Sequence, residues 1–588
     1  MQSNDLLEPA KLYEHELKQK HHDTVVTFFD ELTKKAGTDI EANRITCKNL
    51  HKEEANLEKE RKALDKANGL KGLFVAMIVI GVIAAIASIA FFNSNIGLFI
   101  GLLLGGIALL VGGIILIVKV YKPRSKIIQK EISELEKKIK KLISEAEAQM
   151  ASLNELFESS MPAKLFNKTC PLIEMDRIFD VKKYQMMIDK YEMWGNEEET
   201  SSTLDLQSGS ILGNPFVFFK DLDMSMIKET YYGTRTISYS IGSGNNRHTV
   251  TETLRASYQA PKPVYSKNTY LVYGNDAANR LSFSRSPSNI NSMSEEEIRK
   301  YVRKHEKDLD KIASEQMKKG GNFTPIGNPE FELFFGGLDR DNEVEFRLLF
   351  TALGQKSMMD LLKSKVGYGD DFVFKKIKGL NIISSRHSQG SALFVNTDYL
   401  VGYEYDLVKE NFIEFNDNYF KAIFFDFAPL LSIPLYQQNK THEYIYKGTV
   451  KSNFTPFSHE VVANKYGSSA LAHLKSKTDA ILKSKLVKKS GETDVVHIDA
   501  HSFDAITRIA IVPVRAGNGS IYDVSVPWME YIPLKKESII NISDTGVDDE
   551  IKFKKLGSKD VIYAKGLVSN MDGLNVDIKK IKAQMKKS

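Results

Sequence analysis

Residues 495–504, which read VVHIDAHSFD, concentrate side chains that bind metal ions. If residues 495–501 form a strand, its period of two places His497, Asp499 and His501 on one face, about 7 Å apart in succession. Imidazoles and carboxylates are common ligands of zinc, manganese and iron, and Asp504 could add a further ligand. A divalent-metal site is therefore one interpretation. The interpretation that we favour is a solvated strand face, for which no cofactor is expected.

The sequence around Asp499-Ala500-His501 resembles the Asp-Ala-His-x-Asp metal motif of the arginase and agmatinase family. That family places its second aspartate two residues after the histidine, whereas Asp504 lies three residues after His501. The chain also has no Gly-Gly-x-His motif. The resemblance implies metal-dependent hydrolysis, and the departures favour the solvated strand face.

Other candidate catalytic sets are less complete. Asp370 and Asp371 are adjacent, and neighbours on a strand point to opposite faces, so they are not expected to act as an acid/base pair. The pairs His459-Glu460 and Arg386-His387 are expected to be structural. The early histidines lack a paired set of ligands and are expected on a solvated helix surface; they are His15, His21 and His22. No Gly-x-Ser-x-Gly elbow occurs, so catalytic activity is not expected.

Two long apolar runs lie in the first quarter of the chain, at residues 73–92 and 96–118, and neither contains a charged residue. A helix needs about 20 apolar residues to cross the hydrocarbon layer, and core helices of soluble proteins seldom continue so far without a polar face. Both runs are therefore predicted to span a membrane. Only Asn93, Ser94 and Asn95 separate them, so the spans are expected to be antiparallel neighbours.

Basic residues flank both outer ends of this hairpin, and the connecting tip carries no charge. They are Lys59, Arg61, Lys62, Lys66 and Lys71 before the first span and Lys119, Lys122, Arg124, Lys126 and Lys130 after the second. Such residues remain on the cytoplasmic side. We therefore expect a multi-pass membrane protein with both termini in the cytoplasm. A chain of this size with only Cys47 and Cys170 agrees with a reducing compartment.

Small residues suggest where the two spans meet. Gly97, Gly101 and Gly105 recur at every fourth position of the second span. A similar stripe lies in the first span, comprising Gly81, Ala84, Ala85 and Ser88. In lipid, small residues allow close backbone approach. Glycine is also common in membrane helices without such a role, and both interpretations remain open.

Heptad spacing continues on both sides of the spans. After Pro123, apolar residues alternate at three- and four-residue steps, and before the first span Leu50, Leu57 and Leu64 recur every seven residues. This pattern predicts a coiled-coil stalk in which the two arms pair, because they leave adjacent spans. The alternative is a pair of amphipathic helices packed on the globular body or lying along the membrane. Without a charged residue in either span, a pore is not expected.

The remaining sequence predicts an α+β fold with a cytoplasmic body rich in antiparallel sheet. Strands are expected at 331–337, and helices at 344–365 and around 470–489. The predicted segments are N-terminal helices (1–70), the transmembrane hairpin (71–120), a helical stalk and linker (121–200), a β-rich domain (201–292), an α+β domain (293–442) and a β-rich domain with a basic tail (443–588).

The stretch NEVEFRLLFTALGQKSMMDLL loosely resembles a family of bacterial two-span membrane proteins of unknown function. The shared pattern is an acidic-x-Arg-x-Leu-x-Thr sequence that opens a helix. It is carried here by Glu345, Arg347, Leu349 and Thr351, with Phe346 and Ala352 where the family has a small residue and a proline. The resemblance covers residues 344–364 and implies a bacterial inner-membrane setting without a defined activity.

Basic clusters at residues 475–489 and in the C-terminal tail are interpreted either as contacts with an anionic lipid surface or as charge that keeps the chain soluble. The tail lysines are Lys579, Lys580, Lys582, Lys586 and Lys587. The net charge of +5 is small for 588 residues, and no nucleic-acid partner is expected. The expected partners are the bilayer, other membrane or cytoplasmic proteins, and a second copy through the hairpin or stalk.

Together these features predict a membrane-anchored cytoplasmic interaction or scaffold protein without catalytic activity. The alternative is a membrane-tethered, metal-dependent hydrolase that uses His497, Asp499 and His501.

Overall fold

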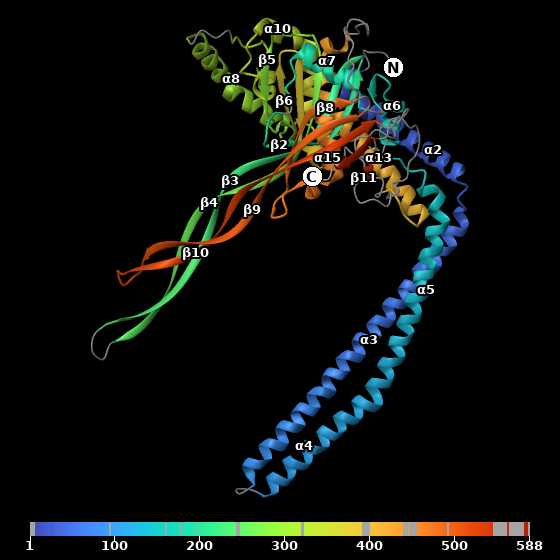
Figure 1. The fold of residues 1–588 in the computed structure, drawn as a ribbon, viewed down its shortest axis with the longest axis vertical. Coiled ribbons are helices and arrows are strands. Elements are labelled where there is room, and N and C mark those ends of the chain that lie inside the picture. Colours follow the sequence, from blue (N-terminus) through green and yellow to red (C-terminus); the bar gives the residue numbers. More distant parts are fainter. Residues whose placement is uncertain are drawn as a thin grey trace. The chain divides into compact units, whose positions relative to one another are not determined.

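The computed structural model describes residues 6–92, 96–158, 161–176, 179–195, 197–242, 247–318, 323–390, 400–438, 445, 455–490, 493–544, 561–563 and 581–585. The fold is α+β, with two long apolar helices and large antiparallel sheets, as predicted (Figure 1). The chain forms two compact units. The larger comprises Met1–Val26, Glu158–Thr397 and Glu414–Ser588, and the smaller comprises Thr27–Phe157 and Asp398–Ile413.

The smaller unit is built on a long helical hairpin. Its elements are the end of α2 (Lys18–Ala36), α3 (Ile40–Ser88), the 3-10 turn η3 (Ile89–Phe91), α4 (Ile96–Leu116), the π-helical turn η4 (Ile117–Tyr121), α5 (Lys122–Asn154) and the start of α13 (Tyr405–Leu431). The side chain of Asp39 caps α3 by accepting from the amide of Ala42. The predicted tip, residues 93–95, lies outside the described residues.

The two arms outside the apolar runs pair along α3 and α5. Near the outer end, Asn43 donates to Gln149 Oε1 at 3.3 Å. Further along, Arg61 lies 3.0 Å from Glu136, and Tyr121 donates to Asn68 at 2.8 Å. Because these bonds are distributed over the length of both arms, α3 and α5 run side by side in opposite directions.

Both α3 and the continuous α4–α5 helix are long and apolar enough to cross a membrane. Their apolar parts meet at glycines. A Cβ at Gly81 would lie 2.6 Å from the carbonyl oxygen of Gly106, and a Cβ at Gly106 would lie 2.7 Å from that of Gly81. A Cβ at Gly113 would clash with Ile78. The backbones therefore touch at these positions.

Of the two interpretations of the glycine stripe, helix contact does not hold for Gly101 and Gly105, since a Cβ at either position would meet nothing within 4 Å. The second span contains two rows of glycine on different helix faces. Gly106 and Gly113, seven residues apart, form the row that faces α3. Periodicity identifies both rows, but only the packing of the partner helix distinguishes them.

The larger unit contains a seven-stranded antiparallel sheet of order β1-β2-β3-β4-β7-β6-β5. Its strands are β1 (Ile173–Met175), β2 (Ser201–Ile211), β3 (Asn214–Ile241), β4 (His248–Gly274), β5 (Ser282–Arg285), β6 (Phe372–Ile377) and β7 (Leu380–Ser385). One buried cluster beside this sheet is rich in phenylalanine and includes Phe216, Phe283 and Phe374. Strands β3 and β4 form a long antiparallel hairpin, and residues 243–246 between them lie outside the described residues.

A five-stranded antiparallel sheet has the order β11-β12-β10-β9-β8. Its strands are β8 (Ile481–Ser490), β9 (Thr493–Arg515), β10 (Ile521–Asp544), β11 (Val561–Tyr563) and β12 (Ile581–Met585). The β9/β10 hairpin and the β3/β4 hairpin both continue past their neighbouring strands (Figure 1). They pack face to face through a small core that includes Leu254, Val524 and Val526.

Helices cover these sheets. They are α1 (Pro9–Leu12), the π-helical turn η2 (Tyr13–Leu17), the start of α2, α6 (Met161–Thr169), α7 (Val181–Tyr191), η6 (Ile290–Ser292), α8 (Glu295–Lys318), α9 (Pro329–Phe335), α10 (Glu343–Leu349), α11 (Ala352–Lys363), α12 (Arg386–Gly390), most of α13, η8 (Pro434–Gln437) and α15 (Pro456–Leu471). Helix α8 begins as its Ser294–Glu297 capping box predicts, with reciprocal side-chain bonds.

Three predicted elements were wrong. The strand at 331–337 is the helix α9, which Asn328 caps by accepting from the amide of Phe331. The single helix at 344–365 is two helices, because Thr351 takes an extended conformation and caps α11. The basic helix around 470–489 is the end of α15 followed by strand β8. In the tail, Lys582 lies on β12, and the other tail lysines lie outside the described residues.

We expect Gly106→Leu to destabilise the helical hairpin and Gly105→Leu to leave it nearly unchanged. The added side chain at residue 106 must displace the backbone of α3, and overpacking of this kind costs about 1–3 kcal/mol. The measurement is the thermal loss of helical circular dichroism of the full chain in detergent. Equal shifts for the two neighbouring substitutions would contradict this helix contact.

Candidate metal-ligand cluster on strands β9 and β10

The candidate ligands lie on strand β9, whose two faces differ in character. Val496, Ile498 and Ala500 are fully buried in a core shared with helix α15. His497 and His501 occupy the opposite face together with Asp499, since the strand alternates its side chains. The period of two thus places the three predicted residues on one face, but Asp499 is nearly buried and only the histidines are partly exposed.

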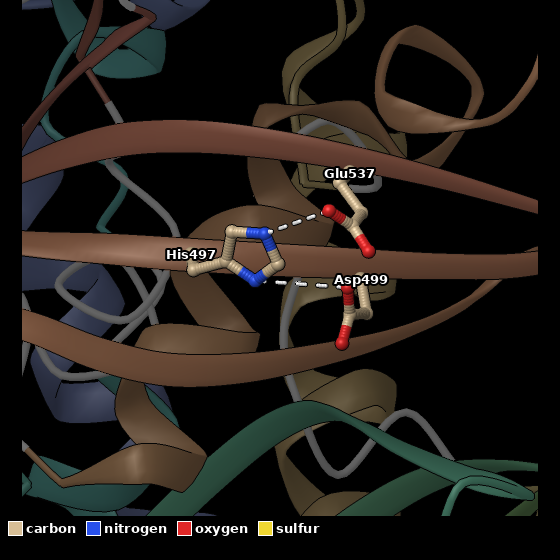
Figure 2. Close-up of side chains that lie close together, drawn as sticks. All are labelled: His497, Asp499 and Glu537. Atoms are coloured by element: carbon tan, nitrogen blue, oxygen red, sulfur yellow. Dashed lines mark ion pairs between the residues drawn. The ribbon is translucent and has the colours of Figure 1, made fainter.

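His497, Asp499 and Glu537 form a cluster across β9 and β10 (Figure 2). Glu537 lies directly opposite Asp499 in the antiparallel register. His497 Nδ1 is 3.6 Å from Asp499 Oδ1, and His497 Nε2 is 3.5 Å from Glu537 Oε2. Potential ligand atoms of the three residues lie within 4.8 Å of one another. Glu537 was missed from the sequence because it lies 38 positions beyond Asp499, and only the strand register brings them together.

His501 and Asp504 do not join this cluster. His501 lies opposite Lys535 on β10 and Ile481 on β8. Its Nε2 atom is buried without a hydrogen-bond partner among the described residues. The carboxylate of Asp504 accepts from the adjacent amide of Ala505 at 2.8 Å. The side chains therefore do not form the ligand set of Asp499, His501 and Asp504 that the arginase-like motif implies.

Lysines occupy the space that a metal ion would need. Lys535 Nζ lies 3.1 Å from Asp499 Oδ1 and 3.0 Å from Glu537 Oε1. Lys485 Nζ, from β8, lies 3.7 Å from Asp499 Oδ2. The two ammonium groups balance the two carboxylates, and a divalent cation would meet strong local repulsion. The donor set therefore does not fit a metal ion while Lys535 holds this position.

The pKa of the Asp499 carboxyl reflects the same arrangement. Burial raises this pKa, but the hydrogen bond and charge of Lys535, together with the charges of His497 and Lys485, bring it below its ordinary value. The pKa of Lys535 is raised in turn by its bonds to Glu537 and Asp499. The cluster acts as an ion-pair network that joins β8, β9 and β10.

Fully buried ion pairs lie elsewhere in the larger unit. Arg285 pairs with Asp370, and both side chains are inaccessible to solvent. Asp370 also accepts from the amide and hydroxyl of Ser288 at 2.6 Å. Asp371 points the other way, toward His387, so the predicted divergence of the two adjacent carboxylates is present. Both residues precede strand β6, so the strand alternation on which the prediction was based does not produce this divergence.

Arg340 forms a second buried ion-pair group. Its guanidinium makes a bidentate contact with Glu332 at 2.8 Å for both bonds and a third bond to Glu343 at 2.8 Å. The guanidinium also lies over the rings of Phe346 and Phe323. The buried guanidinium is therefore paired with two carboxylates, which offset the cost of its burial. This group fastens α9 to the start of α10.

His387 lies between two carboxylates. Nδ1 is 2.6 Å from Asp371 Oδ2, while Nε2 is 3.0 Å from the carbonyl oxygen of Ala422 and 3.4 Å from Asp426 Oδ1. Tyr368 stacks on the imidazole with ring centroids 3.8 Å apart. Both ring nitrogens face acceptors, which the doubly protonated imidazolium satisfies. Burial lowers the pKa of His387, but the bond to Asp371 and the charges of Asp426 and Asp371 raise it overall.

Two further histidines, His459 and His21, have structural partners. His459 Nε2 lies 3.1 Å from Asp494, and Glu460 pairs with Lys483 at 2.8 Å. The expectation that His21 is solvated was wrong, because His21 is 1% exposed and stacks on Phe420. Burial lowers the pKa of His21 to about 3. The helical periodicity of the sequence did not show that the face of α2 that carries His21 packs against α13.

The residues of the bacterial-family motif have local structural contacts. Glu345 accepts from the backbone amide and the guanidinium of Arg280 at 2.8 and 2.9 Å. Arg347 donates to the carbonyl oxygens of Thr324 and Pro325, both at 3.2 Å.

Comparison of the chain with protein-family models, with curated proteins and with solved structures found no match.

The stability contributed by His387 should fall as the pH rises. Because its folded-state pKa is raised, this contribution is complete below the unfolded pKa of about 6.5 and is lost as the pH passes through the folded-state value. We expect the thermal midpoint of the wild-type chain to fall relative to that of His387→Gln above this pH. Exposed His15→Gln is the control and should follow the wild type. If the thermal midpoint of His387→Gln changed with pH in the same way as that of the wild type, the proposal that the His387 imidazole is charged would be contradicted.

Zinc binding should be strengthened severalfold in Lys535→Met, because the substitution removes the ammonium from between Asp499 and Glu537. Isothermal titration of the purified full-length chain with zinc measures this change. The matched control is Lys536→Met, since Lys536 instead donates to the carbonyl of Ala470. For the wild type we expect no tightly bound metal; one ion per chain that is lost in His497→Ala would show that a metal displaces Lys535.

Proposed function

We propose that this chain is a membrane-anchored interaction or scaffold protein whose α3/α4 hairpin crosses the bilayer. The observation that supports this proposal most strongly is the exposure of apolar side chains around the paired helices. Leu73 is 62% exposed, Ile86 64% and Leu104 62%. Side chains of this kind are costly to leave in water and favourable in hydrocarbon.

Charge distribution supports a cytoplasmic location for both ends of the hairpin. Ten lysines and arginines flank the apolar runs on their outer sides, as counted from Lys59 to Lys71 and from Lys119 to Lys130, and no charge lies between the runs. Translocating either flank would carry several of these charges across the bilayer. The paired arms of α3 and α5 then continue into the cytoplasm as a stalk.

The side-chain chemistry of the larger unit supports an interaction role rather than catalysis. Its carboxylates and histidines are arranged in compensated pairs, such as Arg285–Asp370 and His387–Asp371. Pairs of this kind contribute to a rigid, specific packing arrangement. Exposed apolar residues on α10 and α11, including Val344 and Leu348, offer contact area for a protein partner.

Membrane insertion predicts that the full chain sediments with membranes and resists extraction at alkaline pH. A variant that lacks residues 73–118 should enter the soluble fraction, because it has lost its exposed apolar surface. Immunoblotting of the fractions measures both. Full-length chain in the alkaline supernatant would contradict the anchor.

The orientation can be tested by thiol labelling of intact cells with a membrane-impermeant maleimide. The native cysteines Cys47 and Cys170 are buried. We expect Ser94→Cys to react from outside and Ser314→Cys, on exposed α8, to react only after lysis. Labelling of residue 314 in intact cells would reverse the proposed orientation.

A further inference from the structure

The outer edges of the two long hairpins differ in their proline content. Strand β4 carries Pro261 and Pro263, β9 carries Pro513, and β10 carries Pro527 and Pro533, all beyond the neighbouring strands of their sheets. Strand β3 has no proline between Met226 and Ser240. Proline lacks an amide hydrogen, so it disfavours pairing of a strand edge with another strand. Three of the four edges are therefore protected, and the β3 edge is not.

Residue parity determines which amides point outward from each hairpin. On β4, the amide of Thr269 donates outward to Gln389, and Pro261 and Pro263 have the same parity. On β9, the amide of Phe503 donates outward to Thr478, with the same parity as Pro513. These prolines thus remove outward-pointing donors without interrupting the pairing inside either hairpin.

On β3, the outward amides belong to even-numbered residues, because the amide of Met224 donates outward to the carbonyl of Thr200. Strand β2 covers this edge up to the pair Ser201–Asp223. Beyond it, among the described residues, β3 pairs with β4 alone as far as Ile241. A row of available backbone donors and acceptors therefore runs from residue 226 to residue 240, over about 47 Å at 3.3–3.4 Å per residue.

We infer that this edge pairs with the same edge of a second copy of the chain, antiparallel and about a two-fold axis at Tyr232. In this register Glu229 of each copy lies opposite Arg235 of the other. An axis at residue 228 would instead place two Lys228 side chains in opposition. Of the registers that pair outward-pointing residues, only the axis at Tyr232 matches Glu229 with Arg235.

The side chains near the axis are compatible with this pairing. Tyr232 is 74% exposed and would meet its own copy, while Thr230 would lie opposite Thr234. Aromatic pairs and threonine pairs are favourable across strands. Arg235 already donates to the carbonyl of Asp523 through Nη1 at 2.7 Å, and its guanidinium has further N–H groups for Glu229. The pairing uses the larger unit alone and does not depend on the proposed membrane anchor.

Cysteine cross-linking tests the register. The full-length chain is purified in mild detergent and oxidised with copper phenanthroline. Tyr232→Cys is expected to give a disulfide-linked dimer of about twice the 66.3 kDa chain mass, because the two thiols meet at the axis. Ser240→Cys, eight residues from the axis, is expected to remain monomeric. Equal cross-linking at both positions, none at residue 232, or a link to another protein would overturn the inference.

Proline substitution tests the edge itself. Thr234→Pro removes an outward donor of β3, so it is expected to abolish the Tyr232→Cys cross-link and shift the chain to a smaller mass in light scattering. Ser257→Pro removes an outward donor of β4 opposite Tyr232 and should leave the dimer unchanged. Both variants should keep the wild-type thermal midpoint, which shows that they fold. Retention of the dimer in folded Thr234→Pro would contradict β3 pairing.

Discussion

The constraint on which the rest depends is that α3 and α4 expose long uncharged apolar surfaces while touching one another through glycine. Gly81 and Gly106 bring the two backbones into direct contact, so the pair buries little side-chain area against itself. The outer isoleucine and leucine side chains remain exposed. In the proposed membrane-inserted state, hydrocarbon surrounds these side chains, and the helices satisfy their own backbone hydrogen bonds as hydrocarbon requires. The two helical arms are continuations of these helices. Because α4 continues into α5, α3 and α5 leave the apolar region side by side.

In the larger unit, several buried charged groups are paired with groups of opposite charge. Arg285 and Arg340 contact carboxylates and aromatic rings, and His387 lies between Asp371 and Asp426, whose charges raise its pKa. The same compensation explains why the most metal-like cluster does not fit a metal ion. Lys535 already supplies the positive charge that the carboxylates of Asp499 and Glu537 would otherwise receive from a metal ion.

Much of the fold was predictable where one physical signal dominated. The apolar runs, the capping box at Ser294 and the alternation along β9 each identified the correct element. The errors occurred where tertiary packing overrides local pattern. The phenylalanines of 331–335 have strand-like propensity, but Asn328 caps a helix that inserts them into the core. The place of Glu537 in the cluster depends on Asp499, which lies far away in sequence on the neighbouring strand. The burial of His21 likewise depends on Phe420 of α13.

Depth-dependent accessibility of spin labels tests the central claim most directly. Labels placed by Ile83→Cys and Ile107→Cys, near the middle of the two apolar runs, are compared with one at Glu134→Cys on α5 after reconstitution of the full chain into lipid vesicles. We predict that the first two labels are relaxed strongly by oxygen and weakly by a water-soluble nickel complex, and that the third shows the reverse. Equal exposure of all three labels to the nickel complex would show that the hairpin lies in water, and would contradict the account.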